Sequence, residues 1–360
     1  MAASFLIIAW LCLGRLAFPL YVLLMPAAAF VALLVYHQRI AQKRSAARRG
    51  ADFYRAGLAR MQDEWRGRGA SGMQFDVAQH IYAADLDVFG QGGLFELLCA
   101  ARTPLGESTL ARWLSAPADL EAIRLRQLCI DDLRGRLDLR EALATEGESS
   151  IALTAETLIA WSEAPNRLNR LWIRWVARLL AGLAVATLVV WLAWGIRYPL
   201  LAVLLAEVAL GYLLKQSIQR ALAAVERAYE DLKGLSQLLN RIEAEPFGAA
   251  PLRAMVGTLS SHSRSAAKTF AKLATIVNLV ESRRNPMLTP LLLLVMYPLQ
   301  AALAAEGWRS LHGHVIRNWL QVLGEIEALI SLAQFADEHP EYPFPEFLDG
   351  SAAFKATALG

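Results

Sequence analysis

Six basic side chains between residues 253 and 284 are the first candidates for chemistry, because they could bind phosphate groups. Arg264, Lys268 and Lys272 stand four residues apart. Residues four apart lie on one face of a helix, so this spacing predicts a stripe that follows a nucleic-acid backbone. No groove-reading motif accompanies the stripe, and a solvated helix face or a lipid contact are the alternatives. The other candidates for phosphate contact are Arg253, Arg283 and Arg284.

Other chemistry-bearing patterns are absent from the sequence. It contains no G-x-x-x-x-G-K-[ST] motif, and therefore no loop of the type that binds nucleotide phosphates. Six histidines and three cysteines show no metal-ligand or disulfide spacing. His312-Gly313-His314 is interpreted as a surface turn. We therefore predict no catalytic residue, no metal site and no cofactor in this chain.

The composition indicates a membrane protein. Hydrophobic residues make up 56% of the 360 residues, whereas soluble globular proteins are about 45–50% apolar. The net charge of +3 is too small to argue for nucleic acid by itself. Strand patterns are nearly absent, which favours an all-α fold.

Two apolar runs, 179–196 and 200–214, predict a transmembrane hairpin. Basic residues precede it, stand in its turn and follow it: Arg167, Arg170, Arg174, Arg178, Arg197, Lys215 and Arg220. Positive residues concentrate on the cytoplasmic side of bacterial membranes. The larger numbers before and after the hairpin therefore place both of its ends in the cytoplasm.

Glu207 lies inside the second run of this hairpin. A carboxylate within a membrane segment is a candidate functional residue. The alternative, which we favour because no second charge supports a proton relay, is a neutral or paired side chain that faces a neighbouring helix.

The N-terminal region contains two further apolar runs, 2–14 and 16–36. A tight hairpin that turns near residues 15–19 is favoured over a single span preceded by an interfacial segment. Residues 37–49 are basic, which predicts a cytoplasmic position and contact with anionic lipid; a DNA-binding arm is the alternative. An amphipathic helix over 51–66 and a linker over 67–72 are predicted next.

Long helices are predicted after the second hairpin. Apolar residues recur every three or four positions from Ile218 to Ile242, which predicts one helix from Lys215 to Glu245, about 46 Å long at 1.5 Å per residue. Residues 315–335 predict another long helix. The apolar run 287–305 contains two prolines and has no return segment, so we interpret it as a core or membrane-surface helix.

Two short amphipathic helices are predicted over 94–101 and 104–116. Thr103 lies between them, and Pro104 suits a first helical position. Asp119 is a candidate N-cap for the next helix. The residues that define this stretch are Leu94, Phe95, Leu97, Leu98, Thr103, Gly106, Arg112, Trp113, Leu114, Pro117, Arg126 and Gln127.

This stretch resembles the opening of the core domain of MutS-family DNA mismatch repair ATPases, in the bacterial branch that carries membrane segments. The family's elements occur here in order: a Leu-Phe-x-Leu-Leu helix, a Thr-x-x-Gly turn, an Arg-Trp-Leu…Pro helix and Arg-Gln. The resemblance extends more weakly over residues 75–360. It implies that the helix over 315–335 is a returning lever helix.

The resemblance also implies functions that this chain does not itself encode. In the family, ATP and Mg²⁺ bind a C-terminal ATPase domain, and residues 340–360 resemble the linker and first residues before it. We therefore expect a truncated chain, a fragment or a split gene. Phe344-Pro345-Glu346 has the letters of the mismatch-reading motif but lies in a proline-rich linker, so mismatch recognition is in doubt.

The predicted fold is an all-α, membrane-anchored helical bundle with long lever helices and transmembrane hairpins. Its expected segments are 1–36 (membrane), 37–74 (basic helix and linker), 75–166 (first core part), 167–214 (hairpin), 215–345 (levers) and 346–360 (linker). The expected location is the bacterial inner membrane, with several spans and a cytoplasmic body.

The predicted function is the lever and anchor of a MutS-like ATPase, non-catalytic in this chain. The expected partners are the membrane, DNA, and a second copy or an ATPase domain. The alternatives are a membrane scaffold that binds a protein partner and a small transporter subunit.

Overall fold

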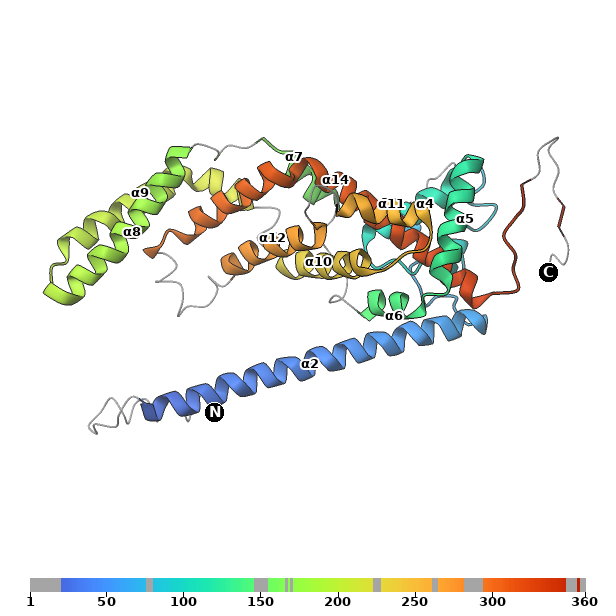
Figure 1. The fold of residues 1–360 in the computed structure, drawn as a ribbon, viewed down its shortest axis with the longest axis horizontal. Coiled ribbons are helices and arrows are strands. Elements are labelled where there is room, and N and C mark those ends of the chain that lie inside the picture. The colour runs from blue at the N-terminus through green and yellow to red at the C-terminus, as the bar shows by residue number, and fades with distance from the viewer. Residues whose placement is uncertain are drawn as a thin grey trace. The chain divides into compact units, whose positions relative to one another are not determined.

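The computed structural model describes residues 21–75, 80–145, 155–165, 168, 171–222, 228–260, 265–281, 294–347 and 355–356. Every regular element in these ranges is helical, as predicted (Figure 1). The elements are α2 (Tyr21–Met61), the short 3₁₀ helix η1 (Met73–Phe75), α3 (Leu94–Leu98), α4 (Pro104–Ser115), α5 (Leu120–Arg134), α6 (Leu137–Thr145), α7 (Ala155–Glu163), α8 (Leu171–Trp194), α9 (Tyr198–Leu222), α10 (Tyr229–Ala244), α11 (Ala250–Leu259), α12 (Ala266–Glu281) and α14 (Tyr297–Glu338).

The chain divides into two compact units, residues 1–55 and 56–360. The described part of the first unit is the N-terminal portion of α2. Sequence analysis placed an apolar run, a basic segment and an amphipathic helix here as separate elements, but all three belong to one helix that ends at Met61. Gly50 and the basic residues do not interrupt it, since a single glycine costs a helix only about 1 kcal/mol. The predicted turn near 15–19 lies outside the described residues.

Helix α14 is the central element of the second unit. Its 42 residues contact α3, α4, α5, α7, α8, α9, α11 and α12. The helix predicted over 315–335 is confirmed, but it begins much earlier, because the last part of the apolar run 287–305 forms its first turns. Leu299 and Ala302 are buried there. This part of the run is a core helix, while residues 287–293 lie outside the described ranges.

The predicted single helix from Lys215 to Glu245 is wrong. Helix α9 ends at Leu222, and α10 begins at Tyr229 with Ala228 outside the helix. Helices α9 and α10 pack against different elements: α10 packs along α12, whereas α9 packs on α8 and α14. The spacing of apolar residues continues across the break, so periodicity alone does not reveal the change of partner.

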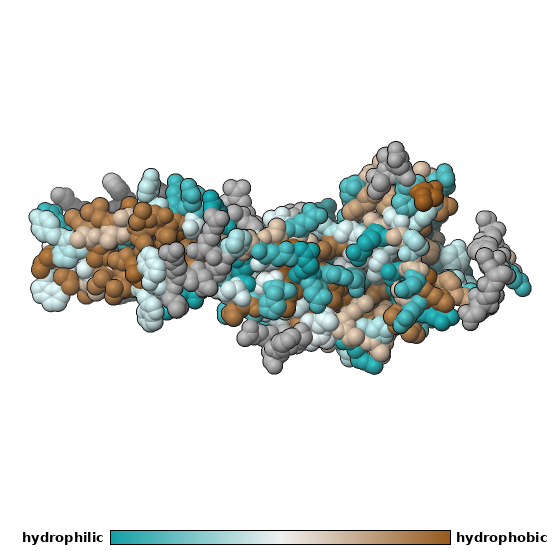
Figure 2. Space-filling view, turned by 90° about the horizontal axis from the view of Figure 1, so that it is seen from above, coloured by the Kyte–Doolittle hydropathy of each residue, from teal (hydrophilic) through white to brown (hydrophobic). Residues whose placement is uncertain are grey.

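Helices α8 and α9 form the hairpin predicted from the two apolar runs. Gly195 in the connecting turn has φ +73, a left-handed conformation that favours glycine. Both helices are long and apolar enough to cross a membrane, and within the described residues these are the two helices that meet that test. Hydrophobic side chains gather over this hairpin on the face shown in Figure 2. Length and composition thus favour membrane association.

The predicted linker over 67–72 is a packed loop rather than a free connection. The Glu96 side chain on α3 is buried, and its carboxylate accepts hydrogen bonds from Gly69 N at 2.9 Å and Gly92 N at 2.6 Å. Gly72 has φ +67 and leaves no room for a side chain, because an added Cβ would lie 2.6 Å from the Phe95 ring. These contacts fix the predicted linker on α3.

Candidate functional site

Several residues of the stretch singled out by sequence, 94–127, pack near the C-terminal end of α14. Thr103 is the N-cap of α4, where its hydroxyl accepts a hydrogen bond from Gly106 N at 3.2 Å. The same hydroxyl donates to the Glu327 carboxylate of α14, and Arg102 N donates to that carboxylate at 3.1 Å. The turn before α4 is therefore fastened to α14 by one buried acid.

Glu327 has only 5% of its surface exposed. Burial raises its pKa to about 7, although the Thr103 hydroxyl and the Arg102 N–H act in the opposite direction. A protonated carboxyl can donate as well as accept a hydrogen bond. Because its described partners are groups of the protein itself, this acid acts as a clasp between helices rather than as a group that meets a substrate.

Two glycines allow α4 and α14 to approach closely. A Cβ added at Gly106 would lie 2.6 Å from Glu327 Oε2, and one added at Gly324 would lie 2.9 Å from Thr109 Oγ1. Gly106 was singled out from the sequence by the family pattern. Its physical role here is to let the first turn of α4 rest on α14.

The apolar motif residues form a small cluster beneath this clasp. Phe95 and Leu98 are buried with Leu110 and Ala328, while Trp113 and Leu114 are half-buried against them. Leu94, Arg112 and Pro117 are exposed, and Leu97 is half-buried. The cluster lies at one end of the helical body and joins α3 and α4 to α14.

Arg126 and Gln127 on α5 extend the motif to the C-terminal segment. The Arg126 guanidinium lies 3.9 Å from the centroid of the Trp113 ring, a cation–π distance. Gln127 Nε2 donates to the Pro345 carbonyl at 3.2 Å. The segment after α14 is therefore bound to α5 through Pro345.

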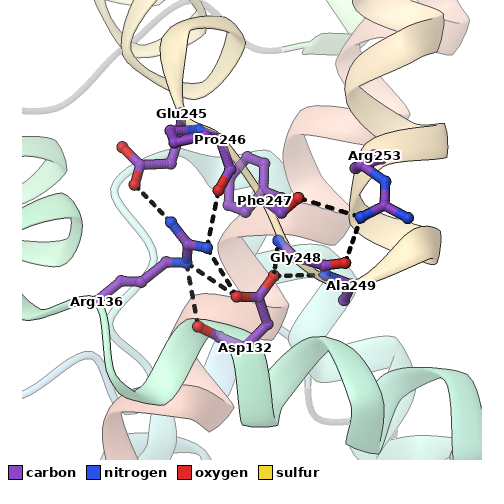
Figure 3. Close-up of polar contacts among 8 residues, drawn as sticks. All are labelled: Asp132, Arg136, Glu245, Pro246, Phe247, Gly248, Ala249 and Arg253. Atoms are coloured by element: carbon purple, nitrogen blue, oxygen red, sulfur yellow. Dashed lines mark hydrogen bonds and ion pairs between the residues drawn. The ribbon is translucent and has the colours of Figure 1, made fainter.

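A second polar cluster joins α5 to the loop before α11 (Figure 3). Asp132 accepts hydrogen bonds from Gly248 N at 2.7 Å, Ala249 N at 2.8 Å and Arg136 Nη2 at 2.8 Å. Burial acts to raise the pKa of Asp132, but the Ala249 N–H and the Arg136 guanidinium outweigh it and lower that pKa. The start of α11 is thus already occupied by the protein's own carboxylate and is not an open phosphate site.

Arg136 and Arg253 complete this cluster. Arg136 donates to Glu245 Oε1 at 2.7 Å and to the Pro246 carbonyl at 2.9 Å. Arg253, predicted to contact DNA phosphate, is exposed and donates to the Gly248 carbonyl. Its guanidinium is engaged in fixing the turn between α10 and α11.

The other predicted phosphate contacts are placed only in part. Lys268 and Lys272 are exposed on the same face of α12, while Phe270, Leu273 and Val277 on the opposite side are buried. The spacing therefore brings two cations to one solvent-facing stripe. Arg264, Arg283 and Arg284 lie outside the described residues.

His312 and His314 do not form the predicted surface turn, because both lie within α14. The His312 ring lies 5.4 Å from the ring of Trp308, so it belongs to a core of aromatic side chains. Among the described residues, no group of three or more His, Cys, Asp or Glu side chains could hold a metal ion.

Glu207 is buried within the hairpin's helical packing. This position fits the alternative in which the side chain faces a neighbouring helix. Its Oε1 atom makes no hydrogen bond with the described part of the chain, so no relay partner is seen there.

Comparisons with known proteins give no relative. No family model, curated protein or solved structure matches this chain.

Sequence reasoning missed Glu327, the Asp132 cluster, and a buried ion pair at the other end of α14. Arg309 Nη2 donates to Glu306 Oε2 at 2.6 Å, and Arg309 Nη1 donates to the Trp161 carbonyl at 3.1 Å. The sequence signal for this ion pair was the presence of Glu306 and Arg309, three residues apart, in an apolar helix. Its partners come from distant parts of the chain, so their identity could not be read from spacing.

Proposed function

We propose that this chain is the membrane-anchored lever and core region of a MutS-like DNA mismatch repair ATPase, and that it acts as a non-catalytic coupling element. The MutS-like part of the proposal rests on the sequence resemblance of residues 94–127. One observation supports the coupling role: α14 is a single helix that contacts the α8–α9 hairpin as well as α3, α4 and α5. At 1.5 Å per residue, 42 residues extend about 63 Å. A continuous helix of this length can transmit displacement between two distant sites.

The hairpin end of α14 is joined firmly to the body. Trp161 Nε1 on α7 donates to the Ala221 carbonyl near the end of α9 at 2.9 Å. The Trp161 ring stacks on that of Trp308 with their centroids 5.9 Å apart. Because Arg309 also binds the Trp161 carbonyl, α7, α9 and α14 would move together.

The motif end of α14 is joined equally firmly. Arg60, near the end of α2, makes two hydrogen bonds of 2.6 Å to the Glu338 carboxylate in the last turn of α14. Both side chains are largely buried, which makes the pair stronger than an exposed one. The clasp at Glu327 adds α4 to the same assembly.

In this proposal, an ATPase domain supplies the motion and this chain carries it to the membrane. That domain would bind ATP and Mg²⁺ and would belong to the same protein or to a partner, with a homodimer as the assembled form. The body would lie in the cytoplasm of a bacterium, beneath the inner membrane. We expect no ATP turnover by this polypeptide alone.

Amide hydrogen exchange along α14 tests the rigidity on which the proposal depends. A rigid lever should show uniform protection from Leu299 to Ala333, because local opening would absorb the motion. Ser310 is exposed in the N-terminal third of the helix. Ser310→Pro removes a helical hydrogen bond and introduces a kink, and it should raise exchange on both sides of the substitution.

Ser310→Ala is the matched control and should leave the protection unchanged. Rapid exchange around residues 310–314 in the unaltered chain would reveal a natural hinge and would contradict the lever. Equal amide exchange rates in Ser310→Pro and Ser310→Ala would show that the protection of α14 does not depend on its continuity.

A further inference from the structure

A polar hollow of about 280 Å³ lies between α8 and α14. Its charged lining comes from Arg174 and Arg178 at the start of α8, and Gln300 of α14 adds a polar side chain. Neither guanidinium forms an ion pair with a carboxylate in the described part of the chain. The hollow therefore carries positive charge that the described carboxylates do not neutralise.

The position of the hollow along α8 matches the edge of a membrane. Its arginines lie just before the apolar run that begins at Leu179. Trp172 and Trp175 on the same turns have 51% and 67% of their surfaces exposed. Exposed tryptophans gather at the level of lipid headgroups, so Arg174 and Arg178 would lie at that level when the hairpin is inserted.

Small residues on α14 keep the hollow open. Ala304 and Gly307 line it, and a Cβ added at Gly307 would lie 3.1 Å from Arg174 Nη2. The Arg174 side chain thus rests against the backbone of α14, which holds its guanidinium in place. A larger side chain at Gly307 would occupy this space without changing the charge.

We propose that this hollow binds the phosphate of an anionic phospholipid headgroup, at the junction of the membrane hairpin and the long helix. Guanidinium groups bind phosphate oxygens through paired, charge-assisted hydrogen bonds. Basic pockets beside membrane helices on the cytoplasmic side are suited to such headgroups. The lipid would connect α14 to the membrane at the base of the lever. This inference rests on the proposed membrane insertion of α8 and α9.

Native mass spectrometry of the detergent-solubilised full chain, titrated with phosphatidylglycerol or phosphatidylcholine, tests the site. Phosphatidylglycerol should be retained preferentially. Arg174→Gln and Arg178→Gln should each weaken its binding by about fivefold, the effect of one basic residue near a membrane surface. Gly307→Leu should weaken it as well. Arg197→Gln, which removes a charge in the hairpin turn, is the matched control and should bind normally.

Three results would overturn the site. Equal weakening by Arg197→Gln, with Gly307→Leu unaffected, would indicate general charge attraction. Displacement of the lipid by inorganic phosphate, with the same variant pattern, would indicate a soluble phosphate ligand. Equal retention of both lipids would show that the hollow does not select the anionic headgroup.

Flotation of the chain with phosphatidylcholine vesicles is measured separately. Failure to float contradicts the proposed membrane anchor. Flotation together with equal retention of the two lipids contradicts the site alone.

Discussion

At the residue scale, the Glu327 carboxylate shows how α4 and α14 are held together. The acid lies on the buried side of α14 and receives hydrogen bonds from Arg102 N and the Thr103 hydroxyl. Ser331, one turn later, donates to the Glu327 carbonyl at 3.0 Å and accepts from Ala100 N at 3.1 Å. The loop from Ala100 to Thr103 is therefore bound to α14 at two successive turns.

The raised pKa of Glu327 makes stability depend on pH. The folded chain keeps this proton up to about pH 7, whereas an unfolded glutamate releases it near its ordinary value of 4.5. The folded state therefore holds more protons between these values, so its stability falls as pH rises across this window, by up to about 3 kcal/mol. Urea unfolding from pH 4.5 to 8 should show this fall, and Glu327→Gln should reduce the slope.

Glu341→Gln, an exposed position after α14, is the matched control and should keep the unaltered pH dependence. An unchanged slope in Glu327→Gln would show that this carboxyl does not titrate in the window.

Gly106, at the contact of α4 with α14, gives a second prediction. Gly106→Ala forces a methyl group against Glu327 and should lower the free energy of unfolding by about 1–3 kcal/mol. Gly257→Ala on α11, where nothing lies within 4 Å of the added Cβ, should raise it by about 0.5–1 kcal/mol. Thermal and urea unfolding of both variants measure the difference. Equal effects at the two positions would contradict the close approach.

At this scale, the residues that begin helices could be predicted from the sequence, whereas side-chain contacts between distant parts of the chain could not. Pro104 at the start of α4 and Asp119 as the N-cap of α5 follow from residue type and position, and the structure confirms both. The structure adds that Thr103, which the sequence placed between two helices, is the N-cap of α4. Glu327 is 224 residues from Thr103 along the chain. No periodicity within either helix identifies that pairing, because it depends on how the helices cross.

At the element scale, the sequence predicts which segments are helical better than it predicts where helices end. The helices of the hairpin and the C-terminal half of α14 follow from runs and spacing of apolar residues. The break at Ala228 and the early start of α14 do not, because apolar spacing is the same on both sides of each boundary. Tertiary partners decide these ends: α10 is fixed by α12, and Leu299 in the first turns of α14 is buried in the core.

The exposed lysines of α12 give a prediction at this scale. If Lys268 and Lys272 contact DNA, the affinity of the chain for a mismatched duplex should fall steeply as the salt concentration rises. Lys268→Gln and Lys272→Gln should each reduce the slope of the logarithm of the binding constant against the logarithm of the salt concentration by about 1. Fluorescence anisotropy across a salt series measures these slopes.

Lys233→Gln serves as the matched control, because Lys233 on α10 pairs with Glu230 at 3.3 Å. An equal change of slope in this variant, or no salt-dependent binding by the unaltered chain, would remove the stripe as a DNA contact. We would then interpret the Lys268 and Lys272 stripe as a solvated helix face.

At the scale of the whole molecule, the proposed function requires that the apolar α8–α9 hairpin anchor the helical body through α14. The sequence predicts the hairpin because two apolar runs flank one short turn. The sequence does not predict that α14 packs directly on both α8 and α9, since α14 begins at Tyr297, far along the chain from the end of α9 at Leu222. In the proposed function, this contact would couple the hairpin to the motion of α14.

Cysteine accessibility in bacterial spheroplasts tests the anchor most directly. Burial raises the pKa of Cys99 to about 12 and that of Cys129 to about 11, so both thiols stay protonated and react slowly at neutral pH. In a Cys12→Ser background, Arg197→Cys should react with a membrane-impermeant maleimide from outside, whereas Lys215→Cys should react only after permeabilisation. Equal labelling of the two positions from one side, or release of the chain by an alkaline wash, would contradict a membrane-spanning hairpin.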